Sequence, residues 1–212
     1  MTCTLLLPST DIPSHFSSGM VLRGIGARVE PFQLYGPMAR KFMFGFTAPQ
    51  SDLIVATGHG DPDELKGIWK VGGIDRNQVN DKVIELISCN CGKELGPELV
   101  KQGAKAVIGF DDDLNWIVCS DNWPDPWNDK YTREALQPIV DGLNNLLDGR
   151  TIYESYLIQK NGLLKNAANS DFELSRACLE FDAAHIVLLG DGNATIRARP
   201  RVVLPPPPPL IF

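Results

Sequence analysis

The sequence predicts a single α/β domain in which a mostly parallel central sheet is covered by helices on both faces. Three observations favour this fold class. Four short apolar runs recur along the chain, each run ends in glycine or polar residues, and segments with helical periodicity follow several of them. At 212 residues the chain can fill one core but is short for two independent domains. Strands that alternate with helices are typical of an open, mostly parallel sheet.

The four apolar runs have the composition of strands that are buried on both faces, with many aliphatic residues and few polar interruptions. They comprise residues 52–57, 83–88, 105–110 and 185–189. The first run is followed by His59, the second by Cys89, and the third by an acidic triplet that begins at Asp111. In such sheets ligands bind beyond the C-terminal ends of the strands, so we expect the functional site at this edge.

Four further segments have the apolar spacing or the boundary residues of helices. They are residues 93–102, 132–147, 151–168 and 171–184. Pro138 falls in the early turns of the second segment, where a proline bends a helix. Asp171 is the expected N-cap of the last segment. Residues 71–79 contain glycine and are expected to form a loop with a small hairpin.

The beginning of the chain differs in composition from the rest. Residues 1–40 are expected to be an N-terminal extension of uncertain structure. Within it, residues 4–7 could form a short strand, and residues 8–36, which are rich in Pro, Ser and Gly, are interpreted as loop with short extended pieces. From residue 41 the chain becomes apolar, and residues 42–46 predict a strand.

The end of the chain, residues 201–212, is a proline-rich tail. The run Pro205–Pro209 is expected to be extended, either as a disordered tail or as a docking motif for a partner. Arg197, Arg199 and Arg201 lie beside this run, a position more typical of a solvated tail than of a binding site.

Charge and hydropathy exclude several classes of partner. The net charge is −6 and the pI about 5.1, so the chain lacks the basic stripe that would neutralise phosphates, and no nucleic-acid partner is expected. No apolar run approaches the roughly 20 residues of a membrane span. The N-terminus lacks the basic leader and apolar stretch of a signal peptide, and no membrane association is expected.

The cysteines are odd in number, which does not suit a disulfide framework in a chain of this size. They are Cys3, Cys89, Cys91, Cys119 and Cys178. We interpret them as free thiols in a reducing compartment, or as one reactive thiol among buried, unreactive cysteines, and we expect a cytoplasmic protein.

His59 and Cys89 form the candidate catalytic pair of a cysteine peptidase. Such an enzyme needs a thiolate, a nearby imidazole and donors for the developing oxyanion. Glycines flank His59, and Gly60 could point its N–H at an oxyanion. Cys89 precedes an expected helix start, and a helix N-terminus lowers a thiol pKa. If the two strands are neighbours, both side chains project from one edge of the sheet.

The residues around this pair resemble the clan CD cysteine peptidases, which include caspases, legumains, gingipains, clostripains and CHAT domains. In that group an apolar strand ends in His-Gly, and a later apolar strand ends in a small residue and Cys, with Gly three residues on. Here the two motifs are residues 54–60 (IVATGHG) and 86–92 (LISCNCG), and the Cys-x-x-Gly register selects Cys89 rather than Cys91.

The resemblance covers roughly residues 41–197. Within this range the similarity is weaker at residues 103–109, 149–155 and 185–191. It implies a three-layer caspase-like (caspase/hemoglobinase) fold, with residues 41–200 as the catalytic domain. It implies a cysteine endopeptidase that works through an acyl-enzyme, with Cys89 as nucleophile and His59 as proton carrier. The backbone N–H groups of Gly60 and Cys89 would hold the oxyanion, and no cofactor or metal is implied.

The resemblance also implies one deep pocket that selects the residue preceding the cut in a peptide or protein substrate. Asp111 and Asp113 follow the strand after the nucleophile, near where such pockets are built, and a carboxylate there would favour Arg or Lys. For any one of the three consecutive Asp residues, a place in a solvated turn is a slightly better explanation. Trp116, Trp123 and Trp127 could wall a substrate cleft, although core packing is the more frequent use of such residues.

Three other interpretations compete with the peptidase hypothesis. Cys89 and Cys91, with His59 and Cys119, could supply four ligands for zinc, although a single Cys-x-Cys is a weak signal. Clan CD also contains non-catalytic interaction or scaffold modules, with which the acidic loop and proline-rich tail are compatible. A nucleotide-binding protein is discounted because no P-loop or complete Gly-x-Gly-x-x-Gly motif follows a strand.

Overall fold

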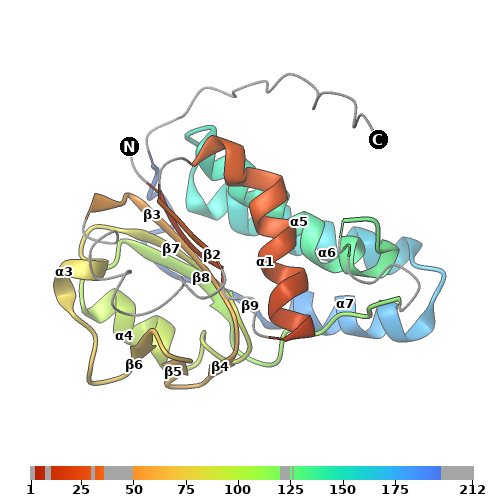
Figure 1. Ribbon diagram of the computed structural model, residues 1–212, viewed down its shortest axis with the longest axis horizontal. Coiled ribbons are helices and arrows are strands. Elements are labelled where there is room, and N and C mark those ends of the chain that lie inside the picture. Colours follow the sequence, from red (N-terminus) through yellow and green to blue (C-terminus); the bar gives the residue numbers. More distant parts are fainter. Residues whose placement is uncertain are drawn as a thin grey trace, which may run out of the picture.

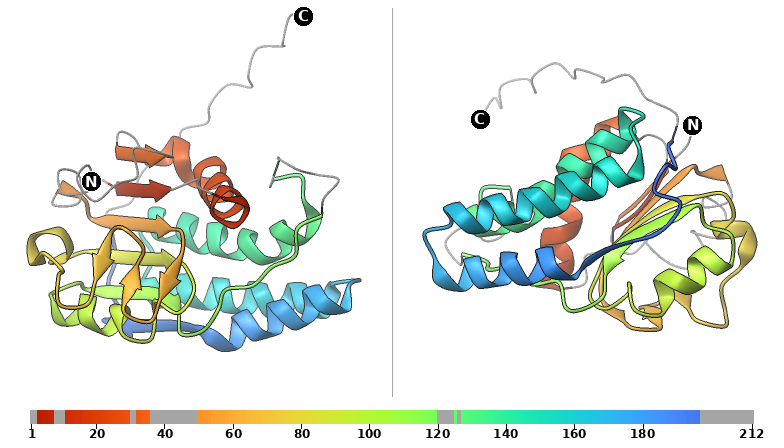
Figure 2. Two further views of the ribbon diagram at one scale, coloured as in Figure 1. Left: turned by 60° about the horizontal axis from the view of Figure 1, so that its bottom comes forward. Right: turned by 180° about the vertical axis from the view of Figure 1, so that it is seen from behind.

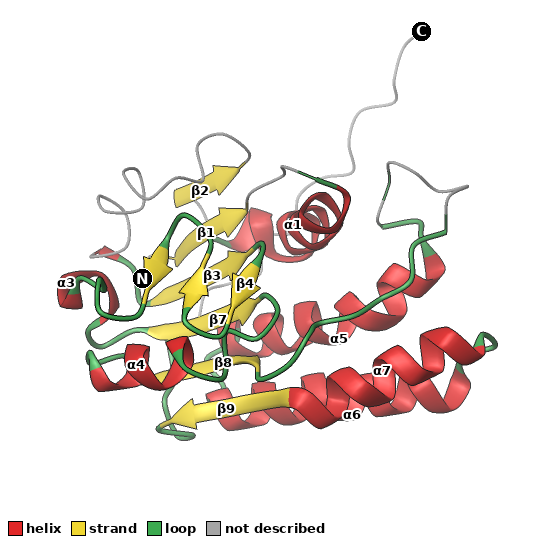
Figure 3. Ribbon diagram, turned by 90° about the horizontal axis from the view of Figure 1, so that it is seen from below, coloured by secondary structure: helices red, strands yellow, loops and turns green. Residues whose placement is uncertain are grey.

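Six strands form a central sheet in the order β2-β1-β3-β7-β8-β9 (Figure 3). The computed structural model describes residues 3–7, 11–29, 32–35, 50–119, 125 and 127–196. The strands are β1 Cys3–Leu7, β2 Phe32–Tyr35, β3 Leu53–Thr57, β7 Val83–Ile87, β8 Ala106–Phe110 and β9 Ile186–Gly190. Neighbouring strands are parallel except for β8 and β9, which are antiparallel. The sheet is therefore mostly parallel, as the sequence predicts.

Helices cover both faces of this sheet and make three layers (Figures 1 and 2). One face carries α1 Ile12–Ile25, α5 Lys130–Leu147, α6 Ile152–Asn169 and α7 Glu173–His185. The other face carries α4 Leu95–Lys101, α3 Arg76–Val79 and a small antiparallel sheet of β4 Gly60–Asp61, β5 Glu64–Leu65 and β6 Trp69–Lys70. The pleat sends alternate residues to opposite sides: in β3, Val55 packs in the core under α5 and Ile54 in the core on the α4 side.

The N-terminal residues belong to this same sheet. β1 lies between β2 and β3, and its residues 3–7 are all buried. The interpretation of residues 8–36 as loop with short extended pieces misses a helix, because 12–25 form α1, whereas β2 at 32–35 is such an extended piece. The serines and glycines of α1 hide its helical pattern, but packing supplies what local propensity lacks. Gly24, for example, lets α1 approach α5 so closely that a Cβ there would lie 2.3 Å from Val140 Cγ1.

Several other local expectations are corrected by the structure. The small hairpin lies at β4–β6, before the region 71–79 where it was expected, and that region contains α3. Asp171 is not the N-cap of α7; Phe172 is, and Asp171 instead pairs with Lys130 at 2.6 Å. His185 ends α7 and does not open β9. The expected strand at 42–46 and the proline-rich tail lie outside the described residues.

Helix α5 continues through Pro138, and two residues of α6 make this feasible. Because proline has no N–H, the Glu134 carbonyl loses its helical donor, and the Asn166 side-chain amide donates to it at 2.7 Å instead. Gly162 makes room for the proline ring, since a Cβ there would lie 2.7 Å from Pro138 Cβ. The α5–α6 contact therefore depends on a small residue facing the proline.

We expect Gly162→Ala to lower the free energy of unfolding by about 1–2 kcal/mol, because the added methyl group collides with a rigid ring. Urea unfolding followed by circular dichroism measures the change. Gly73→Ala is the matched control, since a Cβ at Gly73 meets only the Lys70 carbonyl at 3.6 Å. Equal stability of the two variants would contradict the close packing of α5 on α6.

Within the described ranges, none of the helices combines the length and apolar character needed to cross a membrane.

Candidate active site

The sheet brings His59 and Cys89 to one edge. β3 and β7 are parallel neighbours, and Thr57 lies opposite Ile87 in their register. His59 and Cys89 each follow two residues after these paired positions. The adjacency on which the sequence-based pairing of the two side chains depends is therefore present, and the edge is the C-terminal one, where open α/β sheets bind ligands.

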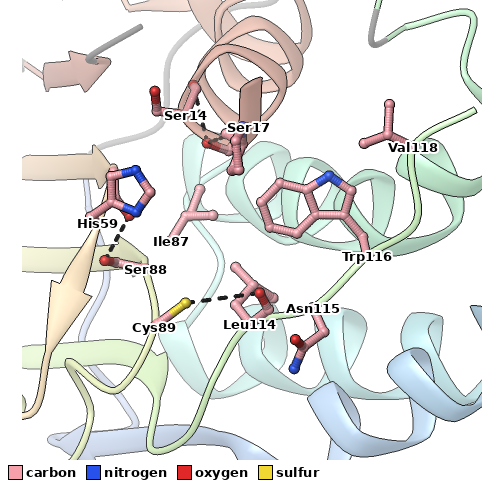
Figure 4. A pocket seen from close by; sticks show the side chains of 12 residues that line it. Ser14, Ser17, His59, Ile87, Ser88, Cys89, Leu114, Asn115, Trp116 and Val118 are labelled. Carbon is pink, nitrogen blue, oxygen red and sulfur yellow. Dashed lines mark hydrogen bonds between the residues drawn. The ribbon is translucent and has the colours of Figure 1, made fainter. Parts of the chain in front are cut away.

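Both side chains line the same cavity, which has a volume of about 250 Å³ and opens to solvent. It lies between the strand ends, the first turns of α1 and the chain that follows β8 (Figure 4). Its lining residues are Pro13, Ser14, Ser17, Gly58, His59, Ile87, Ser88, Cys89, Leu114, Asn115, Trp116 and Val118. Of the residues predicted to bind substrate, which are Asp111, Asp113 and Trp116, Trp116 therefore lines the cavity.

Asp11 is a member of the site that the sequence analysis missed. It is the N-cap of α1, where Oδ1 accepts the Ser14 N–H at 3.0 Å. The other oxygen, Oδ2, pairs with His59 Nε2. Partial burial opposes ionisation of Asp11, but the bonds from His59 and Ser14 outweigh it, so its pKa lies below the usual value. The pattern Asp-x-x-Ser predicts the capped start of a helix, but the sequence does not indicate that this helix start lies beside His59.

The environment of Cys89 differs from the expected one. α4 begins only at Leu95, so Cys89 is not at a helix N-terminus. Burial raises the pKa of the Cys89 thiol, and the nearby carboxylates of Asp113 and Asp182 raise it further. The thiol lies 3.9 Å from the Leu114 carbonyl, to which it donates. The resting site therefore favours the neutral thiol, and the expectation of a helix-lowered pKa is wrong.

Cys91 lies on the opposite side of the sheet from Cys89. It is fully buried in the core under α4, and its thiol donates to the Glu64 carbonyl at 3.5 Å. Burial raises its pKa to about 12. Cys89 packs against the other core and faces the cavity. Of these two cysteines, Cys89 is therefore the one that faces the cavity.

The turns that carry His59 and Cys89 are in direct contact. Ser88 Oγ donates to the Gly58 carbonyl at 2.8 Å. A Cβ at Gly60 would lie 2.2 Å from the Cys89 carbonyl oxygen, so this position admits only glycine. The backbones of Gly60 and Cys89, the predicted oxyanion donors, therefore lie against each other.

In the acidic triplet, the side chains of Asp111 and Asp113 are bonded to protein groups outside the cavity lining. Asp111 Oδ1 pairs with His185 Nδ1 at 2.8 Å. Asp113 Oδ1 accepts the Asn90 side-chain amide at 2.6 Å. Neither Asp111 nor Asp113 is among the described residues that line the cavity. Trp127 stacks on Arg23, with 4.9 Å from the guanidinium to the ring centroid, and Trp123 lies outside the described residues.

A second carboxyl group lies behind the cavity wall. Asp182 of α7 is fully buried, and its Oδ1 accepts the Asn115 N–H at 2.9 Å. Burial raises its pKa to about 8, so it is mostly protonated at neutral pH. Asp182 holds the segment that carries Trp116. The sequence signal for this buried carboxyl group is its spacing. Asp182 follows the buried Leu179 by three residues and therefore lies on the same, apolar side of the helix.

Neither a family model nor a curated protein matches this chain. Among solved structures, the complex of the Porphyromonas gingivalis RgpB pro- and mature domains matches with a TM-score of 0.60 and 14% identity. The fold is caspase-like. The match covers 93% of this chain but 49% of that one, so the chain spans about half of its length. At this identity the likeness extends to the fold alone.

The zinc interpretation gains no support from the geometry. Within the part of the chain that the structure describes, no three His, Cys, Asp or Glu side chains converge as a metal site. Cys89 and Cys91 face opposite cores, and Cys119, whose backbone N–H donates to Asp129 Oδ2 at 2.6 Å, is not among the described residues that line the cavity.

Proposed function

We propose that this chain is a cysteine endopeptidase in which Cys89 is the nucleophile and His59 the general acid and base. The observation that carries the proposal is that both side chains line one cavity at the C-terminal ends of neighbouring parallel strands. The fold supports it, since the structural neighbour is a cysteine peptidase. A peptide or protein is the proposed substrate.

In the proposed reaction, Cys89 Sγ attacks the scissile carbonyl carbon while His59 takes the thiol proton. The C–S bond forms, and the negative charge moves to the carbonyl oxygen, for which the N–H groups of Gly60 and Cys89 are the proposed donors. The C–N bond then breaks as His59 gives the proton to the leaving amine. Water, deprotonated by His59, hydrolyses the thioester and releases the thiol.

Asp11 is the proposed positioning residue for His59. Its carboxylate binds Nε2, which fixes the ring and stabilises the positive charge that His59 carries after it takes the thiol proton. Asp11 is itself held by the Ser14 N–H, so the cap of α1 and the orientation of His59 are linked.

Covalent labelling tests the nucleophile. An electrophilic peptide ketone is incubated with wild type, Cys89→Ala and Cys91→Ala, and the modified residue is identified by mass spectrometry. We expect Cys89 to be labelled in wild type and Cys91→Ala at similar rates, because Cys91 is buried away from the cavity. Labelling at Cys91, or at neither cysteine, would contradict the proposal.

A non-catalytic caspase-like module is the second candidate. It is favoured by one observation: burial raises the pKa of Cys89, and the thiol donates to the Leu114 carbonyl. In that case the peptide ketone leaves Cys89 unmodified, while the small reagent iodoacetamide still alkylates it in the folded protein. The two reagents applied to one sample therefore separate the candidates.

A further inference from the structure

We propose that the cavity beside Cys89 receives the side chain that precedes the scissile bond and selects a large, uncharged, apolar one. This inference rests on the proposed peptidase function and replaces the preference for Arg or Lys that the acidic triplet suggests. The cavity begins at the nucleophile and extends to Trp116 (Figure 4), so a side chain attached to the attacked carbonyl has direct access to it.

The lining is apolar or neutral apart from the catalytic pair. Its walls are formed by Ile87, Leu114, Trp116, Val118 and Pro13. None of the described lining residues is Asp, Glu, Lys or Arg. A cation that entered this cavity would lose part of its hydration without gaining a partner carboxylate from the lining, which is unfavourable.

The serine hydroxyls of the α1 wall are turned inward on the helix. Ser17 Oγ donates to the Pro13 carbonyl at 3.1 Å, and Ser14 Oγ donates to the Asp11 carbonyl at 3.2 Å. Their hydrogen-bond donors are thus used within α1. The serines of this wall therefore offer the cavity mainly the apolar surface of their Cβ methylene groups, and few polar contacts.

The nearest carboxyl groups are occupied by protein partners. Asp11 binds Ser14 and His59, and Asp113 binds Asn90. Asp182 is enclosed behind Asn115, and its raised pKa keeps it mostly neutral at pH 7. Asp11 and Asp113 are exposed, but neither is among the described residues that line the cavity, so the lining itself presents no carboxylate to a substrate guanidinium or ammonium.

Trp116 has two opposite effects on a substrate side chain. Its ring can attract a cation by about 0.5–2 kcal/mol, but removing a charge from water without a partner carboxylate costs more than that. An apolar chain gains about 0.8 kcal/mol for each methylene that it buries. With a volume of about 250 Å³, below the size of a drug-sized ligand pocket, the cavity suits a single side chain such as norleucine or leucine.

The test uses three peptide ketones that differ only at the residue attached to the electrophilic carbonyl: norleucine, lysine or arginine. Lysine has the four-carbon side chain of norleucine plus an ammonium group, so the pair isolates the charge. The rate of Cys89 modification in the full chain is followed by mass spectrometry. We expect the norleucine probe to react at least about 10-fold faster than either cationic probe.

Two variants locate the selectivity. Trp116→Ala should slow the norleucine probe by about 10-fold, since it removes the largest apolar wall. Val118→Asp adds a carboxylate to the lining and should shift the rate ratio towards lysine by about 10-fold. Val71→Asp, at a position that is not among the described lining residues, is the matched control and should leave the ratio unchanged. Thermal unfolding checks that each variant is folded.

Faster labelling by lysine or arginine in wild type would overturn the inference while leaving the peptidase intact. Loss of that cationic preference in Asp182→Asn or Asp113→Asn would then identify the carboxyl group responsible. If no peptide probe modifies Cys89 while iodoacetamide does, the proposed peptidase function fails, and the selectivity fails with it.

Discussion

Replacing His59 with Ala is expected to slow cleavage of a peptide substrate by about 100- to 10,000-fold, because both proton transfers lose their carrier. Asp11→Asn is expected to slow it by about 10- to 100-fold, because the ring of His59 loses the carboxylate that orients it. Both variants are compared with wild type by measuring kcat and KM separately. A loss confined to KM in Asp11→Asn would contradict a positioning role.

The chain offers a matched control for this prediction. Asp75 is also an Asp N-cap, and its side chain accepts the Asn77 N–H at 2.9 Å at the start of α3. Asn caps helices about as well as Asp, so both Asp11→Asn and Asp75→Asn preserve the helix start and change only the charge. Asp75→Asn should retain full activity, and Asp11→Glu should recover part of the rate lost in Asp11→Asn.

Glu85→Gln is expected to stabilise the protein at pH 8 by about 1–3 kcal/mol. Glu85 lies in β7, fully buried on the side of the sheet that faces α6. Burial raises its pKa to about 8 from the usual 4.5, and the nearby Gln159 amide offsets only part of this shift. Glutamine has nearly the shape of the protonated carboxyl group and cannot ionise.

The pH dependence follows from the sign of this shift. Between pH 4.5 and 8 the unfolded chain releases the proton of Glu85 while the folded chain retains it. The contribution of Glu85 to stability therefore falls as the pH rises through this range and levels off above pH 8. Urea unfolding at pH 5 and pH 8 should show the gain from Glu85→Gln mainly at pH 8.

The exposed Glu180 of α7 gives the control, and Glu180→Gln should show no comparable gain. Asp182 has a similarly raised pKa, so part of the decline in stability remains in Glu85→Gln. If Glu85→Gln and wild type lose stability in parallel from pH 5 to pH 8, Glu85 is ionised in the folded protein and the prediction is wrong.

Predictions from the sequence succeeded where a local pattern is sufficient to define an element. The aliphatic run that became β7 can be buried on both faces only as an inner strand, and its end fixes the position of Cys89. Predictions failed where packing decides. α1 contains three serines and two glycines, and its helix is stabilised by contacts with α5 and the sheet.

The four apolar runs predicted β3, β7, β8 and β9, and with them the placement of His59 and Cys89 after two of these strands, because hydrophobic periodicity and strand ends are local properties. The surroundings of these two side chains follow from the tertiary fold. Asp11 reaches His59 across 48 residues of chain, and the segment 114–118 closes a cavity beside Cys89. The charge, burial and hydrogen bonding of a site depend on contacts between residues that are far apart in the chain. The spacing of residues along the sequence does not specify these contacts.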